Sequence, residues 1–544
     1  MSPVETYTEG QRTCASVIAQ TLASRGITRV FGHPGGEILH LIDALETSGI
    51  KFILTGHESA AAFMASVSGR LTGTPGACLA TVGPGACNLV LGVGAAYLDR
   101  DPMLAFSGVV ATNRNSITSK QNLDLRSLFA PISKLSLTLD GTSTEQTLLS
   151  AINLSCCAPR GPVFLGLPTD IARFDDRPAE TPTPPEPSTA NFCRNFGQIS
   201  QTLNAACRPI GIIGIALDAL ADTDTVRRFF SETGIPYLVS PQAKGIADES
   251  GQGFLGTLGT GAGDGLINAW LDGSDCCIGI GFDPVEYSSI WNLRKPFYSI
   301  AKSSIGFQHH WPIAECTGNV GALLRQLHAA YRGVSTWSVA DVENHRKAMA
   351  AVLRPPTERN DRGLAPFHVI RTLRQALPED AILTVDVGAH KMLACQTWRA
   401  PHYGTFLVSN GLSAMGFGVP AALAAALVHP SRPVIGIVGD GGFGMMVQEL
   451  ETARRIGVHP LFVVFADRSL AAIKLAQRGQ NTPYRGVEFA PVDWTKVAEG
   501  FGAHALTAKC LSDIGDAVQQ WLGDPKLTVV TAPIDDELYV GLTY

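Results

Sequence analysis

The stretch "PVIGIVGDGGFGMMVQELETARRIGVHPLFVVFAD", residues 433–467, decides the fold class. It begins with an apolar run of strand-forming residues, continues with a segment of helical length and spacing, and ends in a second apolar run. A strand, a helix and a strand in this order form a βαβ unit, in which both strands run parallel. The stretch therefore predicts a parallel sheet with helices packed on it.

The same alternation extends outward along the chain. Strand-like runs such as "GACLATVG" (76–83), "RPIGIIG" (208–214) and "AILTVDVG" (381–388) are separated by Ala- and Leu-rich helical stretches. Strands that are apolar on both faces are typical of parallel sheets covered by helices on both sides. The predicted fold class is α/β, with three tandem doubly wound parallel-sheet domains, the central one Rossmann-like: residues 1–174, 192–345 and 367–544, joined by Pro-rich linkers at 175–191 and 346–366.

Composition and charge exclude several classes of partner. The formal net charge of −6 gives no electrostatic reason to expect binding to nucleic acid or to an anionic membrane surface. The first residues, "MSPVETYTEGQRT", are polar and lack the apolar segment of a signal peptide. No window holds the roughly 20 unbroken apolar residues that span a bilayer. We therefore expect a cytoplasmic protein without nucleic-acid or membrane partners.

Two aspartates follow directly after the strands of the opening stretch. Asp440 and Asp467 are expected at the carboxyl ends of parallel strands, the edge at which open α/β sheets bind ligands. Two converging carboxylates are stabilised by a cation such as Mg²⁺ or Ca²⁺, and the helix N-terminus after Asp440 favours a phosphate. Two other interpretations stay open for this loop alone: "GDGGFG" matches a dinucleotide fingerprint, and Asp440 could simply cap the helix.

In its motifs the chain resembles the thiamine diphosphate-dependent enzymes of the acetolactate synthase and pyruvate decarboxylase group. Residues 439–469 resemble the metal–diphosphate motif of that family. The resemblance implies thiamine diphosphate and Mg²⁺ as cofactors, with the metal bound by the Asp440 and Asp467 side chains and the Ser469 carbonyl. Asp467 stands where the family commonly has Asn, which adds negative charge beside the metal.

The first predicted domain resembles the family's pyrimidine-binding domain through "FGHPGGEILHLIDAL" (31–45), "LTGHESAAAFMA" (54–65) and "TVGPGACN" (81–88). Glu58 stands at the position of the cofactor-activating glutamate, whose carboxyl group favours the imino tautomer of the aminopyrimidine. Pro34 and Gly35 are expected to contact the cofactor.

The last predicted domain resembles the diphosphate-binding domain through "VDVGAHK" (385–391) and "SNGLSAMGFGVPAAL" (409–423). Met415 is expected to prop the cofactor in its bent form. The resemblance also implies that Glu58 and Asp440 meet across a subunit interface, so we expect a homodimer at minimum and a homotetramer as the full assembly. The expected cofactor-binding residues of this domain are Gly388, Ala389, His390, Gly411, Leu412, Met415, Gly439, Asp440, Gly441, Gly442 and Phe443.

Several stretches favour carbon–carbon ligation over simple decarboxylation. The region that carries adjacent histidines in simple decarboxylases, residues 109–122, has none here, and the pair His309–His310 in the central domain is expected to be structural. Residues 119–134 resemble the corresponding segment of acetolactate synthases. By that resemblance Gln121 would orient the acceptor and Lys134 would face a substrate carboxylate, although a surface role for Lys134 stays open.

Residues 279–292 and 486–503 resemble the catabolic acetolactate synthases, and the Arg-rich segment of the FAD-binding biosynthetic enzymes is missing, so FAD is not expected. Small residues Ala471 and Ala472 would leave room for a larger substrate. The predicted function is a carboligase that decarboxylates a 2-oxo acid, with pyruvate as the expected donor, and joins the enamine to a second carbonyl compound. The alternatives are a decarboxylase, or an acyloin-forming ligase or lyase with another donor or acceptor. A dehydrogenase and a nucleotide-binding paralogue without activity fit fewer motifs.

Overall fold

The computed structural model describes residues 12–177, 195–261, 263–287, 295–304, 312–354 and 362–541. The chain folds into two compact units, residues 1–188 and residues 189–544. The histidine pair 309–310 lies outside the described residues. No helix in the described ranges is both long and apolar enough to cross a membrane.

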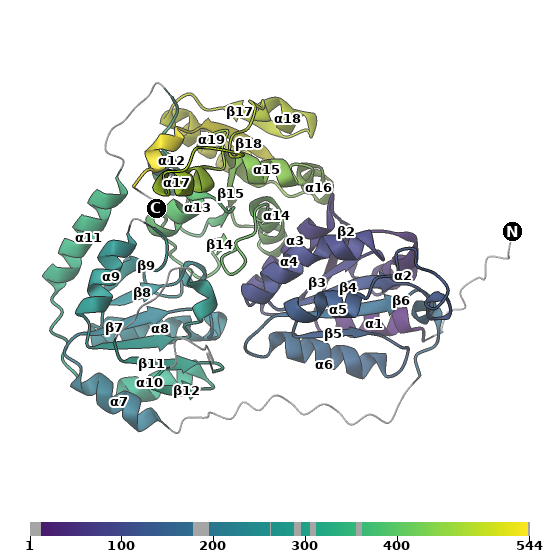
Figure 1. Cartoon of the computed structure of the whole chain (residues 1–544), viewed down its shortest axis with the longest axis horizontal. Coiled ribbons are helices and arrows are strands. Elements are labelled where there is room, and N and C mark those ends of the chain that lie inside the picture. Colours follow the sequence, from purple (N-terminus) through teal and green to yellow (C-terminus); the bar gives the residue numbers. More distant parts are fainter. Residues whose placement is uncertain are drawn as a thin grey trace. The chain divides into compact units, whose positions relative to one another are not determined.

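The first unit is built on one six-stranded sheet in which every pair of neighbours is parallel. Strands β3 (Gly76–Ala80) and β6 (Pro162–Pro168) are buried along their whole length, as expected for a sheet with helices on both faces. Figure 1 labels most of these strands and the helices around them. The strand order is β2 (Lys51–Leu54), β1 (Arg29–His33), β3 (Gly76–Ala80), β4 (Met103–Val109), β6 (Pro162–Pro168) and β5 (Leu135–Thr138). The helices are α1 (Cys14–Ser24), α2 (Leu39–Thr47), α3 (Glu58–Thr72), α4 (Pro84–Leu98), α5 (Leu125–Phe129) and α6 (Thr144–Cys156).

The second unit contains two further parallel sheets. The central one has the strand order of a dinucleotide-binding fold, 3-2-1-4-5-6 when read from β9. Its strands are β9 (Phe254–Thr257), β8 (Tyr237–Val239), β7 (Pro209–Ile213), β10 (Cys276–Ile280), β11 (Phe297–Ala301) and β12 (Ala314–Thr317). Its helices are α7 (Phe196–Ala205), α8 (Ala219–Thr233), α9 (Asp264–Gly273), α10 (Val320–Ala330) and α11 (Val339–Leu353). Helix α11 contains residues 346–353, the first part of the stretch predicted as a linker.

The last sheet repeats the strand order of the first unit. Both sheets read 2-1-3-4-6-5, so strand order reverses between the first and third strands, which is β1/β3 in one sheet and β13/β15 in the other. Its strands are β14 (Phe406–Val408), β13 (Ile382–Val385), β15 (Val434–Gly439), β16 (Leu461–Ala466), β18 (Thr528–Pro533) and β17 (His504–Thr507). Its helices are α12 (Pro366–Ala376), α13 (Ala389–Thr397), α14 (Gly418–Val428), α15 (Asp440–Met446), α16 (Glu449–Ile456), α17 (Ala471–Gly479), α18 (Trp494–Gly500) and α19 (Leu511–Gly523).

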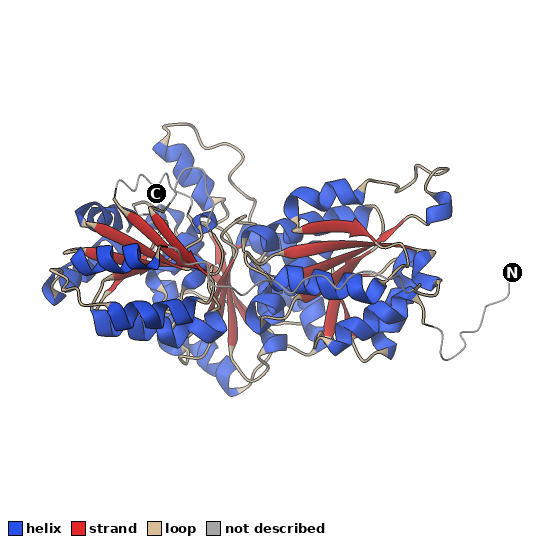
Figure 2. Cartoon of the chain, turned by 90° about the horizontal axis from the view of Figure 1, so that it is seen from below, coloured by secondary structure: helices blue, strands red, loops and turns tan. Residues whose placement is uncertain are grey.

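The fold class is confirmed: within the described ranges, three six-stranded parallel sheets alternate with helices along the chain. Figure 2 shows helices on both faces of the sheets. Within the second unit, a continuous core joins strand residues of the central sheet, such as Ile210 and Leu238, to Leu383 and Val463 of the last sheet. The segment predicted as one helix after Asp440 is divided into α15 and α16 by a turn at residues 447–448.

Candidate functional site

Three loops of the last sheet meet where its strand order reverses. Asp386, directly after β13, is fully buried and accepts hydrogen bonds from the backbone N–H groups of Val387 (2.7 Å) and Gly416 (2.9 Å). A Cβ on Gly442, in helix α15, would overlap Asp386 Oδ2. Burial raises the pKa of Asp386 to about 6. Asp386 thus joins the β13, β14 and α15 loops, and the sequence analysis missed it although it follows a strand as Asp440 does.

His390 lies in the first turn of α13 and is buried. Its ring lies against two glycines. A Cβ added to Gly388 would lie 2.5 Å from His390 Cε1, and one added to Gly439 would lie 3.0 Å from it, so the ring occupies the space that side chains would need there. Burial lowers the pKa of His390 to about 4, so the imidazole is neutral at physiological pH. Nε2 has no hydrogen-bond partner among the described residues. A buried polar atom without a partner fits a site that a polar ligand completes.

Asp440 and Asp467 follow the neighbouring parallel strands β15 and β16, as predicted. Asp440 accepts hydrogen bonds from the N–H groups of Gly441 (2.8 Å) and Arg468 (2.7 Å), and Asp467 Oδ1 accepts from Ser469 N–H (3.0 Å). Burial raises the pKa of Asp440 to about 6. Burial and then the charge of Asp440 raise the pKa of Asp467 to about 8. Two carboxylates that disfavour each other's ionised form suit a divalent cation between them.

A third acid lies beside this pair. Asp536 Oδ2 accepts hydrogen bonds from Ser469 Oγ (3.2 Å) and from Lys474 Nζ (2.7 Å), so its charge is paired with an ammonium group. In the part of the chain that the structure describes, no group of three or more His, Cys, Asp or Glu side chains could hold a metal ion. A cation here would therefore combine Asp440 and Asp467 with a carbonyl and with oxygen atoms of a ligand.

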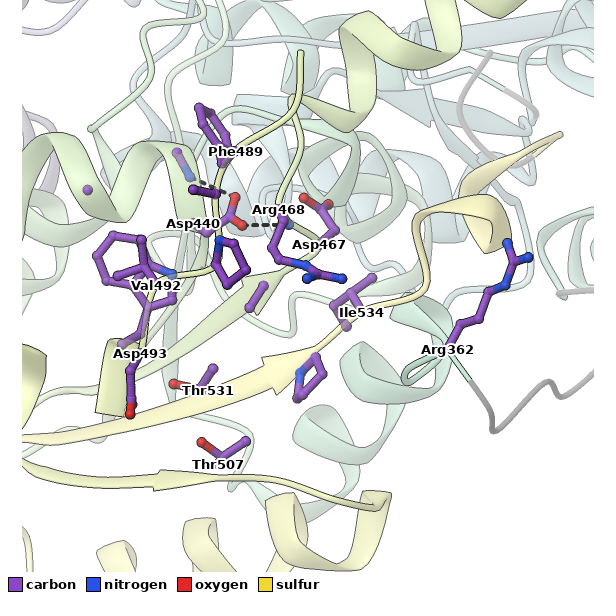
Figure 3. Close-up of a pocket in the computed structure, with 17 residues that line it drawn as sticks. Arg362, Asp440, Asp467, Arg468, Phe489, Val492, Asp493, Thr507, Thr531 and Ile534 are labelled. Atoms are coloured by element: carbon purple, nitrogen blue, oxygen red, sulfur yellow. Dashed lines mark hydrogen bonds between the residues drawn. The ribbon is translucent and has the colours of Figure 1, made fainter. Parts of the chain in front are cut away.

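A cavity of about 640 Å³ opens beside the two carboxylates. Figure 3 shows Asp440 and Asp467 on neighbouring loops, with Arg468, the residue after Asp467, near them in the view. Phe489 and Trp494 supply aromatic walls, and the lining residues are Arg362, Asp440, Gly441, Gly444, Ala466, Asp467, Arg468, Phe489, Ala490, Pro491, Val492, Asp493, Trp494, Thr507, Thr531, Pro533 and Ile534.

The other predicted residues of the last sheet lie close to this group. A Cβ on Gly441 would lie 3.3 Å from both Met415 Cε and Phe489 Cε2, so the predicted cofactor prop reaches the metal loop. Gly411 and Leu412 precede Met415 in the same loop, and Leu412 is 39% exposed. Phe443 is fully buried and packs edge-on against Trp494 with 5.3 Å between ring centroids. A ligand would therefore contact only the backbone of Phe443.

The two alanines at the start of helix α17 lie at the core of the second unit. Ala471 is buried in the core and Ala472 packs against it, whereas Ile473 is 52% exposed. Neither alanine lines the cavity beside Asp440 and Asp467, and the expectation that they leave room for a larger substrate stays a prediction. Ile473 is the residue of this turn that reaches the surface.

In the first unit, Glu58 is the first residue of α3 and is buried. The helix begins after His57, whose side chain accepts from Ser59 N–H (3.1 Å), and it ends at Gly73 with φ +74°. Asn88 Nδ2 donates to Glu58 Oε2 (2.9 Å), and the positive end of the helix dipole favours the carboxylate. A Cβ on Gly85 would lie 3.2 Å from Oε1. Asn88, the last residue of a quoted motif, is thus a positioning partner that the sequence analysis overlooked.

Pro34 and Gly35 follow β1 and lie beside the loop after β3. Thr81 Oγ1 donates to Glu37 Oε2 (2.7 Å), and a Cβ on Gly35 would overlap the Thr81 side chain. Thr81 also lies next to Gly85, because a Cβ added to Gly85 would be only 2.9 Å from Thr81 Cγ2. Gly35 and Glu58 are therefore connected through Thr81 and Gly85 at the edge where this sheet reverses its strand order.

Gln121 and Lys134 differ in their surroundings. Gln121 is exposed, has φ +59°, and lies against the loop at Gly83, 3.0 Å from the position of a Cβ there. Lys134 Nζ donates to the carbonyl oxygens of Leu154 (2.5 Å) and Cys157 (2.6 Å) at the end of α6. Burial lowers the pKa of Lys134. These contacts favour a helix-capping role for Lys134, and its assignment to the substrate stays a prediction.

The central sheet has a tightly connected edge. Ala216 N–H, after β7, donates to Gly281 O, after β10 (2.6 Å), and the Glu286 carboxylate accepts from the N–H groups of Ile215 and Gln242 (both 3.2 Å). In the glycine-rich stretch, the Asp264 carboxylate accepts hydrogen bonds from the backbone N–H groups of Gly259, Thr260 and Gly261. The N–H groups of Ile215 and Gln242 are thus already bound by Glu286, and those of residues 259–261 by Asp264.

Comparison with known proteins agrees with this architecture. The chain matches the N-terminal TPP binding domain of thiamine pyrophosphate enzymes over residues 12–128, their central domain over 197–327 and their C-terminal TPP binding domain over 386–532. It is 27% identical to "Acetolactate synthase" of Bacillus subtilis over 96% of this chain and 93% of that protein. It is 28% identical to "Acetolactate synthase, catabolic" of Raoultella terrigena (96% and 95%) and 27% identical to "Pyruvate oxidase" of Lactiplantibacillus plantarum (93% and 85%). The chain therefore belongs to the thiamine pyrophosphate enzyme family and is similar over almost its whole length to acetolactate synthases.

Proposed function

We propose that this protein is a thiamine diphosphate- and Mg²⁺-dependent carboligase of the acetolactate synthase type. It would decarboxylate a 2-oxo acid, pyruvate first among the candidates, and join the remaining two-carbon unit to a second 2-oxo acid. The observation that carries the proposal is the Asp440–Asp467 pair at the ends of adjacent parallel strands, with Asp440 buried and Asp467 partly buried. The names of the relatives, most of which are acetolactate synthases, support the reaction class.

The paired acids would hold Mg²⁺, with Asp440 and Asp467 as side-chain ligands and Ser469 as carbonyl ligand. Their raised pKa values indicate that the empty pair is electrostatically unfavourable, so a divalent cation offsets the repulsion. The α15 N-terminus after Asp440 would accept the diphosphate, with the unpaired Nε2 of His390 as a further contact. Burial lowers the pKa of His390 to about 4, so the ring is neutral before an anion binds beside it.

Thiamine diphosphate, when bound, supplies a carbon nucleophile that adds to the carbonyl of a 2-oxo acid and accepts the electron pair released with CO₂. Glu58 would hold and move a proton at its Oε1, because Oε2 is engaged by Asn88. Met415 would fix the shape of the cofactor, and the exposed Gln121 would orient the acceptor.

We also propose that a complete site needs two copies of the chain. Glu58 belongs to the first compact unit and Asp440 to the second. In the family that the chain resembles, these residues meet across a subunit interface, so a homodimer, assembled further to a tetramer, would carry the activity. Light scattering of the purified protein in the presence of cofactor measures the assembly directly, and an active monomer would contradict this part of the proposal.

FAD is not part of the proposed function. The amides of Ile215 and Gln242, at the edge where a dinucleotide phosphate would bind, already donate to the Glu286 carboxylate. A phosphate there would meet a buried acid instead of free N–H groups. The absorbance spectrum of the purified protein between 350 and 500 nm tests this expectation, because bound flavin would be visible.

The deciding experiment is product identification by mass spectrometry after incubation with thiamine diphosphate, Mg²⁺ and pyruvate. Acetolactate and CO₂ are the expected products. Acetaldehyde alone would instead assign the protein to the decarboxylases. Pyruvate left unconsumed by a protein that binds the cofactor would point to another donor, to be sought among larger 2-oxo acids.

A further inference from the structure

Lys391 is a buried lysine, 7% exposed, that no step of the proposed reaction uses. It lies in the first turn of α13, directly after His390. Its Nζ donates to Ser413 Oγ (3.0 Å), Ser409 O (3.3 Å) and Asn410 Oδ1 (3.4 Å). One ammonium group thus connects helix α13 to the loop that follows β14.

Ser413, the nearest of these partners, has an unusual backbone conformation. Its φ of +54° lies in the left-handed region, which is unfavourable for any residue with a Cβ. Its Oγ accepts from Lys391 and donates to Asn410 O (2.9 Å), which closes a small ring of hydrogen bonds. Asn410 Nδ2 donates in turn to Glu286 O (2.8 Å) in the central part of the same unit. The loop is therefore held on one side by Lys391 and on the other by the backbone at Glu286.

The conformation of Ser413 determines where the next residues lie. Two positions further along, Met415 reaches the metal loop, with its Cε 3.3 Å from the position of a Cβ on Gly441. Gly416 then donates its N–H to the buried Asp386. If Ser413 relaxed to a right-handed conformation, the chain direction before Met415 would change and these contacts would be lost.

We propose that Lys391 is a positioning residue of the cofactor site, which holds Ser413 in its left-handed conformation and so presents residues 411–415 to thiamine diphosphate. The inference rests on the proposed function, because it names what shapes the same site. A buried ammonium group suits this role, since each of its hydrogen bonds is charge-assisted and its position is fixed by the helix that carries it.

The test compares Lys391→Met, which keeps an unbranched apolar stem and removes all three donors, with the wild-type protein. The affinity for thiamine diphosphate at saturating Mg²⁺ is measured by calorimetry on the full chain. Lys391→Met is expected to weaken binding at least about tenfold, the size of effect that loss of one or two charge-assisted hydrogen bonds produces. Lys526→Met, at an exposed lysine of the same unit, is the matched control and is expected to leave the affinity unchanged.

A rescue separates this role from direct contact with the ligand. Glycine adopts a φ of +54° without strain, so adding Ser413→Gly to Lys391→Met is expected to recover most of the affinity. A double variant as weak as Lys391→Met, or a single variant with wild-type affinity, would overturn the proposal. Should Lys391→Met fail to fold, Lys391→Gln takes its place, because glutamine retains a donor for Ser413. Lys391→Gln is expected to lose less affinity for thiamine diphosphate, and adding Ser413→Gly is expected to restore it.

Hydrogen–deuterium exchange of the cofactor-free protein gives a readout that does not depend on the proposed function. Residues 409–415 are expected to exchange faster in Lys391→Met while strand β15 is unchanged. Equal exchange in the two proteins would refute the positioning role. A wild-type protein that binds no thiamine diphosphate would overturn the proposed function, and the exchange experiment would still decide whether Lys391 orders the loop.

Discussion

Replacing Asp467 by asparagine is expected to remove most of the pH dependence of Mg²⁺ binding. Burial and the neighbouring Asp440 raise the pKa of Asp467 to about 8 in the metal-free protein. An acid with a raised pKa keeps its proton until the pH exceeds that value, so at neutral pH the metal has to displace a proton. Asparagine offers a carbonyl oxygen at the same place and has no proton to lose.

The expected magnitude follows from the fraction of ionised Asp467. With a pKa of about 8, about 3% of the group is ionised at pH 6.5 and half at pH 8, so the apparent affinity should rise about fifteenfold over this range. The pKa of Asp440, raised to about 6, contributes a small dependence that both proteins share. Any titration of the diphosphate affects both proteins equally. The difference between wild type and Asp467→Asn in how steeply the Mg²⁺ affinity rises with pH therefore reports on Asp467 alone.

Calorimetric titration of Mg²⁺ into protein saturated with thiamine diphosphate, repeated from pH 6.5 to 8 in buffers of different ionisation enthalpy, measures both affinity and proton release. The wild-type protein is expected to release nearly one proton more than Asp467→Asn at pH 7. Glu451→Gln, at an exposed acid that pairs with Arg455 on helix α16, is the control and should keep the wild-type slope. Equal slopes and equal proton release in wild type and Asp467→Asn would refute the reasoning.

Three further substitutions test other parts of the site. Glu58→Gln is expected to bind thiamine diphosphate normally but to lower kcat at least about a hundredfold, because the amide cannot move a proton; unaltered turnover in steady-state kinetics would contradict that role. Gly442→Ala should destabilise the second unit by about 1–3 kcal/mol, since the new Cβ overlaps Asp386; thermal unfolding measures this, and an unchanged Tm would argue against the crowding. Lys134→Met is expected to lower the Tm and leave the KM for pyruvate unchanged, because its ammonium caps α6; a raised KM with unchanged Tm would instead assign it to the substrate.

Much of the fold could be predicted because its signal is periodic and local. Uninterrupted apolar strands such as residues 434–439 and 461–466 can only be buried in parallel sheets, and the acids after them are recognisable as strand ends. Asp386 carries the same signal and could have been found by the same rule. Elements without such a signal were harder: helix α11 extends to Leu353, into a stretch predicted as a linker, because its amphipathic spacing continues up to the Pro pair.

The contacts that shape the site are less visible in the sequence. Lys391 donates a hydrogen bond to Ser413, 22 residues further along the chain. The left-handed backbone conformation of Ser413 cannot be recognised in the sequence, because the residue is not glycine. For Lys134, the motif predicts a contact with the substrate. In the structure its ammonium group donates to two carbonyl oxygens at the end of α6, and these contacts depend on how that helix packs. Long-range polar pairing of this kind is decided by tertiary structure.

The first and last sheets have the same strand order but differ in the residues that follow equivalent strands. In the last sheet the residues directly after the third and fourth strands are Asp440 and Asp467, which suit a cation and a diphosphate. In the first unit the residues directly after the equivalent strands, β3 and β4, are Thr81 and Val110, which carry no charge. At this edge of the first sheet, Glu58 follows the second strand and accepts a hydrogen bond from Asn88, and Glu37 follows the first strand and accepts one from Thr81. Glu58 suits a heterocycle that exchanges a proton, and the Asp440–Asp467 pair suits a metal–diphosphate. The two halves of the proposed cofactor site therefore share a strand order and differ in the residues that follow equivalent strands.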